Sequence, residues 1–438
     1  DAPHLAARLL APGAGARVAT TLDADLQRHV AAVLERQVRA LAGRNVRDAA
    51  ALVVDNASGD VLAWVGGSGA PSSARHVDGV RARRQAGSTL KPFLYAQAFE
   101  RRLLSPATRL ADAPLDVVTP LGTWRPENYD HGHRGPVAAR EALASSLNVP
   151  AVRVLQMVGV DGFVARLRAL GIGSLRDPDF YGDSLALGSA DVSLFELVGA
   201  YRALANGGAW SPLRVTPKGD AGRARRVLSE QAVWLVADAL ADRASRAPTF
   251  GLESPLATRR WSAVKTGTSK DMRDNWCLGW TRRFTAGVWV GNFSGASMWD
   301  VSGVDGAAPA WLEIVEALPD DGADAPPPPP GVVRAGGTFL LAGTEPATAA
   351  APRTRAPQRI LAPLDGALLA LDPDIPDARE RILVEAEPAD ASLSLVLDGV
   401  RIGHAAEPVL WQPVRGRHVL ALLDAGGREV DAVAFRVR

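Results

Sequence analysis

Apolar residues recur about every four positions across residues 22–41, with mostly polar residues between them. This spacing predicts one long amphipathic helix, for which Thr21 or Asp23 can serve as the N-cap. Residues 1–20 have no regular pattern and are interrupted by proline and glycine, so we expect them to be irregular.

Short runs of β-branched and aromatic residues predict strands at both ends of the region that follows. The predicted strands are residues 51–56, 61–65, 261–266, 275–281 and 284–293. Between the second and third of them lie helical patterns at residues 88–104, 137–147, 149–157, 162–170, 194–205 and 227–240, and a last one follows at 309–318. Residues 105–135 are polar and contain proline. The order predicts an α+β domain with one antiparallel sheet formed by both ends of its sequence, flanking helices and a helical subdomain.

The pattern changes after residue 318. Residues 320–352 are rich in proline, glycine and alanine and include five consecutive prolines, which predicts an extended linker. Short alternating runs follow over residues 353–438. They are broken at Asp365-Gly366, Asp398-Gly399 and Gly426-Gly427. This spacing is typical of a small all-β, Ig-like sandwich of about seven strands. We therefore expect two folded domains, residues 21–319 and 353–438.

Composition narrows the functional classes. Of the 438 residues 47% are apolar and 22% charged, and the net charge is +1, which gives no reason to expect nucleic-acid binding. No uncharged apolar run is long enough to predict a transmembrane helix. The only cysteine, Cys277, excludes an internal disulfide and most simply is a buried small side chain. His131 and His133 lie in a polar loop without a third ligand at suitable spacing, so we expect no metal and no cofactor.

Lysine is scarce in this chain. Of 49 basic residues only four are lysines, Lys91, Lys218, Lys265 and Lys270. Where arginine has replaced lysine elsewhere, a remaining lysine is a candidate for a task that needs loss of a proton near neutral pH.

Lys91 stands three residues after Ser88, at the start of a predicted helix, so the two side chains share one helix face. A neutral lysine amine there could take the proton of the serine hydroxyl and make it a nucleophile. The pair alone is weak evidence, because S-x-x-K is common by chance.

Two further motifs supply partners for this pair. Ser146 and Asn148, in a loop between predicted helices, offer a hydroxyl and a carboxamide two positions apart, although both residues also suit an ordinary helix cap. Residues 265–268 read Lys-Thr-Gly-Thr at the end of a predicted strand. A strand edge there could pair with an extended peptide, Gly267 would permit close approach, and Lys265 could meet a carboxylate.

The three motifs in this order resemble those of the penicillin-binding proteins and serine β-lactamases, although the middle motif reads Ser-Leu-Asn instead of S-D-N. The segments that resemble the transpeptidase domain of class A penicillin-binding proteins, most closely the 1C branch, are residues 87–93, 125–129, 145–150, 200–208, 265–269 and 273–276. Residues 353–438 resemble the C-terminal domain of that branch. The resemblance implies the transpeptidase fold of this superfamily. It also implies that residues 1–20 are a linker from a missing glycosyltransferase domain and membrane anchor, on the periplasmic face of the bacterial inner membrane.

The resemblance also implies a role for each motif residue in peptidoglycan D,D-transpeptidation. Ser88 would attack the D-Ala-D-Ala amide of a stem peptide, or a β-lactam, with Lys91 as its base. Lys265 would lower the pKa of Lys91, and Ser146 would pass the proton to the leaving amine. The remaining expected contacts are Asn148 on the substrate backbone, the amides of Ser88 and Thr268 as oxyanion hole, and Thr266 and Thr268 on the terminal carboxylate.

Alternatives stay open at this point. Water could replace the acceptor amine, which would make the protein a D,D-carboxypeptidase. The site could also be non-catalytic and only bind β-lactam or peptidoglycan, with the C-terminal domain docking other periplasmic proteins. An E-x-x-L-N element, which activates water in class A β-lactamases, is absent between Asn148 and Lys265, so we expect a long-lived acyl adduct.

Overall fold

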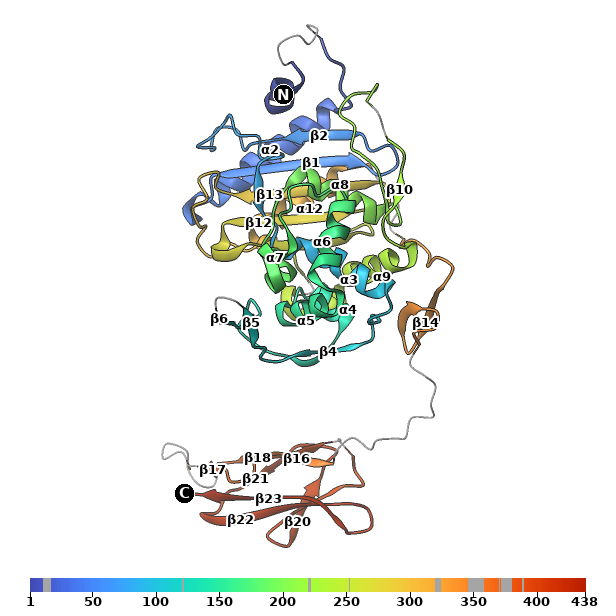
Figure 1. The fold of residues 1–438 in the computed structure, drawn as a ribbon. Coiled ribbons are helices and arrows are strands. Elements are labelled where there is room, and N and C mark those ends of the chain that lie inside the picture. Colours follow the sequence, from blue (N-terminus) through green and yellow to red (C-terminus); the bar gives the residue numbers. More distant parts are fainter. Residues whose placement is uncertain are drawn as a thin grey trace. The chain divides into compact units, whose positions relative to one another are not determined.

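The computed structural model divides into two compact units, Asp1–Glu345 and Pro346–Arg438 (Figure 1). It describes residues 1–10, 17–119, 122–219, 222–251, 253–319, 324–345, 358–369, 371, 380–387 and 390–438.

A five-stranded antiparallel sheet forms the centre of the first unit. Its strands lie in the order β11 (Ala263–Thr268), β12 (Asp274–Trp280), β13 (Phe284–Gly291), β1 (Asp48–Asp55) and β2 (Val61–Val65). β1 pairs with β13 and with β2, so strands from both ends of the domain's sequence form one sheet, as the sequence predicted. Among the described strands β11 is an edge strand, so its outer side has no strand partner there.

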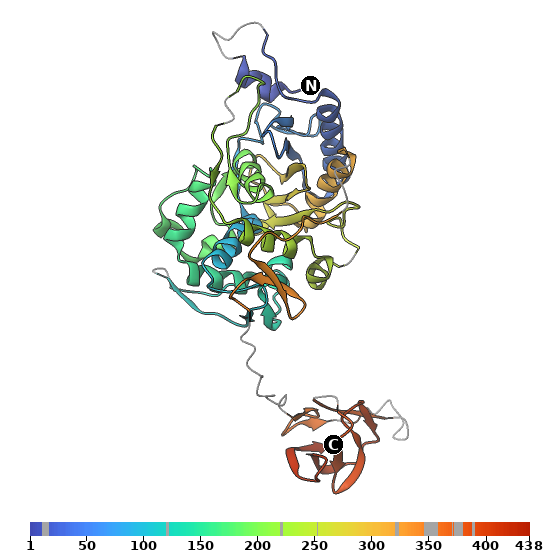
Figure 2. The same cartoon turned by 90° about the vertical axis from the view of Figure 1, so that its right-hand side faces the viewer.

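Helices cover both faces of this sheet (Figure 2). On one face α2 (Ala24–Ala40) and α12 (Ala308–Ala317) bury a core that includes Val53, Cys277 and Trp311. Asp23 caps α2 by accepting the backbone N–H groups of Asp25 and Leu26. The other face carries the larger helical block. Its helices are α3 (Lys91–Glu100), α4 (Ala139–Ala144), α5 (Asn148–Val158), α6 (Val160–Ala169), α7 (Pro178–Tyr181), α8 (Leu194–Ala205), α9 (Glu230–Ala241) and α10 (Arg243–Phe250).

Two predicted helices are shorter than expected. The helix predicted over 88–104 begins as a 3₁₀ turn, η2 (Gly87–Leu90), and ends with α3 at Glu100. The one predicted over 137–147 is reduced to α4, because residues 135–138 instead form β7 and pair with β4 (Arg109–Asp112). Hydrogen bonding between strands distant in sequence thus outweighs the local helical pattern.

Three segments expected to be irregular contain regular structure. Residues 3–9 form α1, which buries Leu5 in the core. Within 105–135 lie β4 and a hairpin, β5 (Val117–Thr119) and β6 (Gly122–Trp124). Within the expected linker, β14 (Val332–Ala335) and β15 (Thr338–Leu341) form a hairpin whose Phe339 ring packs edge-on against Trp234, with ring centroids 4.8 Å apart. Burial of this apolar segment explains why it folds into a hairpin although its flanks are rich in proline and glycine.

The second unit contains two sheets. One has the order β16 (Arg359–Ala362), β18 (Ile382–Glu387) and β21 (Val409–Trp411). The other has the order β17 (Leu368–Leu369), β23 (Glu429–Val437), β22 (Gly416–Leu423), β19 (Ser394–Leu397) and β20 (Val400–His404). The described residues thus contribute eight strands where about seven were expected. Two predicted turns are confirmed, since Asp398 and Gly399 have φ values of 50° and 80° and Gly426-Gly427 lie between β22 and β23.

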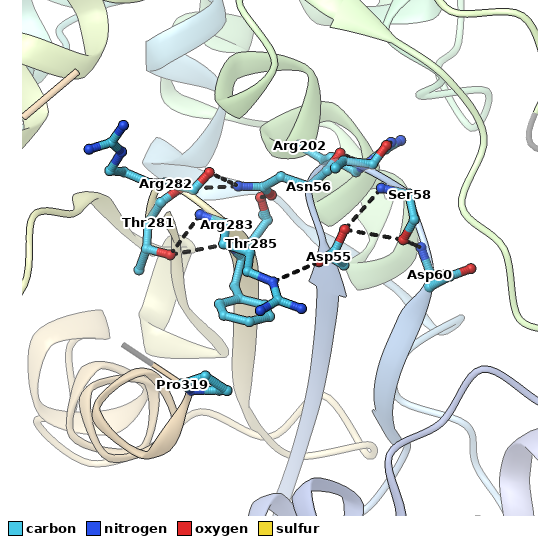
Figure 3. Close-up of polar contacts among 12 residues, drawn as sticks. Asp55, Asn56, Ser58, Asp60, Arg202, Thr281, Arg282, Arg283, Thr285 and Pro319 are labelled. Carbon is cyan, nitrogen blue, oxygen red and sulfur yellow. Dashed lines mark hydrogen bonds and ion pairs between the residues drawn. The ribbon is translucent and has the colours of Figure 1, made fainter. Parts of the chain in front are cut away.

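The end of the sheet where β1 turns into β2 is held by buried polar side chains (Figure 3). Arg202 of α8 is 3% exposed and donates to the carbonyls of Asn56, Ala57 and Ser211, and to the Ser211 hydroxyl, over 2.8–3.3 Å. The Asn56 amide donates to the carbonyl of Thr281 at 3.1 Å, on the turn from β12 to β13. Two turns and one helix are thereby tied together by hydrogen bonds whose donors and acceptors are matched.

Candidate active site

Ser88 lies in η2, between the sheet and α3, and is partly exposed. Gly87 before it has a φ of 55°, and a Cβ at that position would lie 2.7 Å from the carbonyl oxygen of Thr268. Only glycine therefore allows the Ser88 turn to sit this close to β11. The turn is also held by α8, because the Tyr201 hydroxyl of that helix donates to the Thr89 carbonyl at 2.8 Å.

Lys91 is fully buried at the start of α3. Its Nζ donates to the carbonyls of Ser146 and Leu147 at 2.7 and 3.0 Å and to Oδ1 of Asn148 at 2.7 Å. Burial, and then the charge of Lys265, hold the pKa of Lys91 well below its usual value. The structure thus joins the first motif to the second through Lys91. In the described residues Lys91 makes no hydrogen bond to Ser88, whose hydroxyl has no partner there.

Ser146 adopts a left-handed backbone conformation with φ 60°, which is rare for a residue other than glycine. Its Oγ accepts a hydrogen bond of 2.7 Å from Lys265 Nζ, which also donates to the Thr266 carbonyl at 2.8 Å. Burial lowers the pKa of Lys265 to about 7. Backbone strain of this kind persists where the surroundings enforce it, and here it places the hydroxyl against the lysine of the third motif.

Asn148 is held by residues to which sequence reasoning assigned no role. Its backbone N–H donates to Oδ1 of Asn128 at 2.8 Å, and its Nδ2 donates to the Glu127 carbonyl at 2.7 Å. Nδ2 of Asn128 in turn donates to both carboxylate oxygens of the fully buried Asp112, at 2.8 and 2.9 Å. Residues 125–129 had been noted only as a point of resemblance, and nothing in the sequence near Asp112 signalled this contact.

The third motif occupies the edge strand. Alternation along β11 places Lys265 and Gly267 on the face toward η2, and Thr266 and Thr268 on the opposite face. A Cβ at Gly267 would lie 2.7 Å from the Thr89 side chain, so glycine is required for the strand to approach η2. Oγ1 of Thr268 accepts the backbone N–H of Gly303 at 3.0 Å, which leaves the hydroxyl proton free to donate.

The structure therefore brings the three motifs together around one edge of the sheet. Two buried lysines with lowered pKa values flank Ser146, and glycines allow Ser88 and Thr268 to meet. The described residues contain no group of three or more potential metal ligands. His131 is exposed and pairs with Glu127 through Nδ1 at 2.6 Å. Such an arrangement can activate a serine and hold an extended peptide beside it.

The family model described as "Penicillin binding protein transpeptidase domain" matches residues 49–292. The chain belongs to this family. Residues 347–435 match the "Penicillin-Binding Protein C-terminus Family". The fold prediction is thereby confirmed for both parts of the chain.

Curated relatives agree with this assignment. Penicillin-binding protein 1C of Escherichia coli is 32% identical over 97% of this chain and 60% of its own length. Penicillin-binding protein 1B of Vibrio cholerae is 33% identical over 56% of this chain and 32% of its own length. The chain thus spans a third to about three fifths of these relatives. The resemblance to the 1C branch is supported by both matched domains and by the E. coli relative.

Solved structures show the same fold. Penicillin-binding protein 1A from Haemophilus influenzae superposes with a TM-score of 0.60 at 23% identity, covering 68% of this chain and 54% of that one. The PonA1 protein from Mycobacterium tuberculosis, in complex with penicillin V, gives a TM-score of 0.60 at 21% identity, covering 74% and 90%. No helix in the described ranges is both long and apolar enough to cross a membrane.

Proposed function

We propose that this transpeptidase domain is a serine D,D-transpeptidase that cross-links peptidoglycan stem peptides and is acylated by β-lactams. The observation that carries the proposal is the burial of Lys91 against the Ser146–Asn148 segment, next to the turn that presents Ser88. Burial and the charge of Lys265 lower the pKa of Lys91, which favours the neutral amine that can accept a proton, whereas an ordinary surface lysine stays protonated.

The reaction follows from these positions. The oxygen of Ser88 attacks the carbonyl carbon of the D-Ala-D-Ala amide while its proton passes to Lys91. The amides of Ser88 and Thr268 stabilise the oxyanion, each by on the order of a hundredfold in rate. Ser146, hydrogen-bonded to Lys265, delivers a proton to the leaving amine and receives the proton that Lys91 took from Ser88, so that the C–N bond breaks and D-Ala departs. An acceptor amine then attacks the acyl-serine and restores the hydroxyl.

Intact mass after incubation with several β-lactams tests the proposal. We expect one covalent adduct on the wild-type protein and none on Ser88→Ala. No adduct with any β-lactam would contradict the enzymatic function, whereas an unchanged adduct on Ser88→Ala would contradict only the choice of nucleophile. Incubation with a stem peptide and an amine acceptor then distinguishes the cross-linked product from the hydrolysed one.

Ser146 and its neighbour provide a matched pair of variants. The Ser145 hydroxyl is not among the acceptors of Lys265 in the described residues and donates to the Ser245 carbonyl at 2.8 Å. We expect Ser146→Ala to slow acylation strongly and Ser145→Ala to leave it nearly unchanged. Equal effects would contradict a role for the Ser146 hydroxyl in proton transfer.

The properties of the full-length protein belong to the same proposal and rest on the resemblance. They are fusion to a glycosyltransferase domain, action on the periplasmic face of the inner membrane, and docking of other periplasmic proteins by the C-terminal unit. The match of residues 347–435 to the C-terminal family defines the domain in which docking of other proteins can be tested.

A further inference from the structure

A cleft with a volume of about 450 Å³ lies between α9 and the β14–β15 hairpin, which packs beside that helix (Figure 1). This volume falls within the range of small-molecule sites, roughly 300–1,000 Å³. None of the three motifs contributes a residue to the lining of the cleft. The cleft is therefore separate from the active site described above.

Three partly buried aromatic side chains, Trp234, Trp261 and Phe339, line the cleft. The rings of Trp234 and Phe339 stand edge to face, with an angle of 80° between their planes. The Trp234 indole N–H donates to the Pro326 carbonyl at 3.0 Å, which fixes the orientation of this ring. The indole N–H of Trp261 makes no hydrogen bond within the described residues. Fixed aromatic rings of this kind offer apolar surface to a ligand.

The polar part of the lining carries charges of both signs. Nη2 of Arg140, on α4, lies 2.9 Å from Oδ2 of Asp242 and 3.4 Å from Oδ2 of Asp238. Asp238 accepts from no other group in the described chain, and burial raises its pKa. On the hairpin, Arg334 lies over the Phe339 ring, 5.6 Å from the ring centroid, and has no acceptor among the described residues. The cleft thus holds both a carboxylate with unused acceptors and a guanidinium with unused donors.

This lining favours a saccharide over a charged ligand. A sugar ring has apolar C–H faces that pack on aromatic side chains, and its hydroxyl groups both donate and accept hydrogen bonds. A carboxylate beside a guanidinium supplies a partner for each role. A cationic amine would be repelled by Arg140 and Arg334, and an anionic ligand by Asp238 and Asp242, so a neutral ligand suits the cleft better.

Hydrogen bonds connect the cleft to the second motif. Oδ2 of Asp242 accepts the Ser245 hydroxyl at 2.6 Å, and the Ser245 carbonyl accepts the Ser145 hydroxyl at 2.8 Å. Arg140 lies in the first turn of α4, and Ser146 follows the end of that helix. The six residues of α4 span roughly 9 Å. An extended peptide of a few residues, at about 3.4 Å per residue, covers this distance.

We propose that the cleft binds the N-acetylhexosamine backbone of the glycan strand whose stem peptide enters the active site. The inference rests on the proposed function, because that function supplies a substrate in which sugar and peptide are joined. The aromatic side chains pack against the sugar faces, Asp238 accepts hydrogen bonds from hydroxyl groups, and Arg334 donates to hydroxyl or acetamido oxygens. A strand held in the cleft keeps its stem peptide close to Ser146.

A tetrasaccharide of β-1,4-linked N-acetylglucosamine, which carries no peptide, tests the cleft by calorimetric titration of the full chain. We expect saturable binding to the wild type, and binding weakened about tenfold or more by Asp238→Ala and by Trp261→Ala. The matched controls are Asp179→Ala and Trp299→Ala, because both side chains are exposed and lie outside the cleft. Both controls should bind the tetrasaccharide as the wild type does.

No binding to the wild type at millimolar tetrasaccharide, or equal weakening by the controls, would overturn the inference. The proposed function would still stand if a β-lactam adduct forms. Tetrasaccharide binding without any β-lactam adduct would instead overturn the proposed function, and with it the assignment of the glycan strand as substrate. If Trp261→Ala does not fold, Trp261→Leu replaces it. That variant keeps apolar volume but loses the ring, so unchanged binding by it would also count against the inference.

A second measurement links the cleft to the reaction. Cross-linking of stem peptides attached to a short glycan strand is compared with cross-linking of free stem peptides. The ratio of the two kcat/KM values should fall severalfold in Asp238→Ala, through a higher KM for the glycan-attached substrate, and should stay at the wild-type value in Asp179→Ala. A ratio that is the same in Asp238→Ala and wild type would overturn the inference.

Discussion

Two buried arginines of the transpeptidase unit differ in the number of hydrogen bonds that they donate. Arg202, at the turn end of the sheet, is 3% exposed and donates four hydrogen bonds, two to the turn between β1 and β2 and two to Ser211 (Figure 3). Arg246, on α10, is 5% exposed and donates none in the described chain. The two side chains are therefore buried to a similar degree, but in the described protein only Arg202 has hydrogen-bond acceptors.

The difference shows that two cations buried to a similar degree can differ in how far the described protein satisfies their hydrogen-bond donors. A charge whose donors are all accepted by the protein stabilises the fold, whereas a charge without acceptors is stabilised only when a ligand brings them. Lys91 and Lys265 stand between these cases, because their amines have acceptors but burial lowers their pKa values. The following predictions test this comparison, from the largest expected effect to the smallest.

Replacing each of the two buried lysines by arginine should show which one acts as a proton acceptor and which one acts through its positive charge. Lys91→Arg should abolish acylation, a loss of about a thousandfold or more, because a guanidinium does not give up its proton. Lys265→Arg keeps the charge and should retain part of the rate. Time courses of adduct formation measure both variants, and equal losses would mean that Lys91 is not the base.

The structural arginine should matter for folding. Arg202→Met removes four hydrogen bonds, although the Asn56 carbonyl keeps the one from Asn206, and should lower the free energy of unfolding by about 3 kcal/mol or more. Urea denaturation measures this loss, and Arg246→Met is the control that should not show it. Similar destabilisation by the two substitutions would remove the distinction drawn between the two arginines.

Two asparagines allow a similar comparison: Asn128 supports the active site, and Asn206 lies at the turn end of the sheet. Asn128→Ala removes the support of Asn148 and should slow acylation about tenfold to a hundredfold. Asn206→Ala removes a hydrogen bond of 2.7 Å to the Asn56 carbonyl at the turn end, and should reduce stability without changing the acylation rate of the folded protein. A similar fall in rate for Asn206→Ala would contradict a local role for Asn128.

The last prediction, with the smallest effect per measured step, is a pH dependence of stability. The pKa of Lys265 falls from 10.5 to about 7 on folding, so between these values the unfolded state binds more protons than the folded one. The free energy of unfolding should therefore rise from pH 7 to about pH 10, by up to about 1.4 kcal/mol per pH unit from this residue. Below pH 7 both states are protonated and the contribution is constant. Urea denaturation of Lys265→Met between pH 7 and 9.5 should show a shallower slope than wild type, and identical slopes would contradict the lowered pKa.

Much of the fold followed from local patterns, with instructive exceptions. The five strands of the main sheet and most helices lie within a few residues of their predicted positions, because their apolar periodicity agrees with the burial they reach. The hairpin at 332–341 and the shortened α4 were not predicted. Both depend on contacts with residues far away in the sequence, Trp234 in one case and β4 in the other.

The sequence by itself determined the three motifs, their order and the scarcity of lysine, and these were enough to predict the family. Only the tertiary structure decided how the motifs meet: Lys91 bound to the Ser146–Asn148 segment, Lys265 bound to the Ser146 hydroxyl, and Asp112 supporting Asn128. It alone also separated Arg202, which donates four hydrogen bonds, from Arg246, which donates none within the described residues. The physical reason is that a residue type is a local property, whereas burial, pKa and hydrogen-bond satisfaction depend on which distant groups share its surroundings.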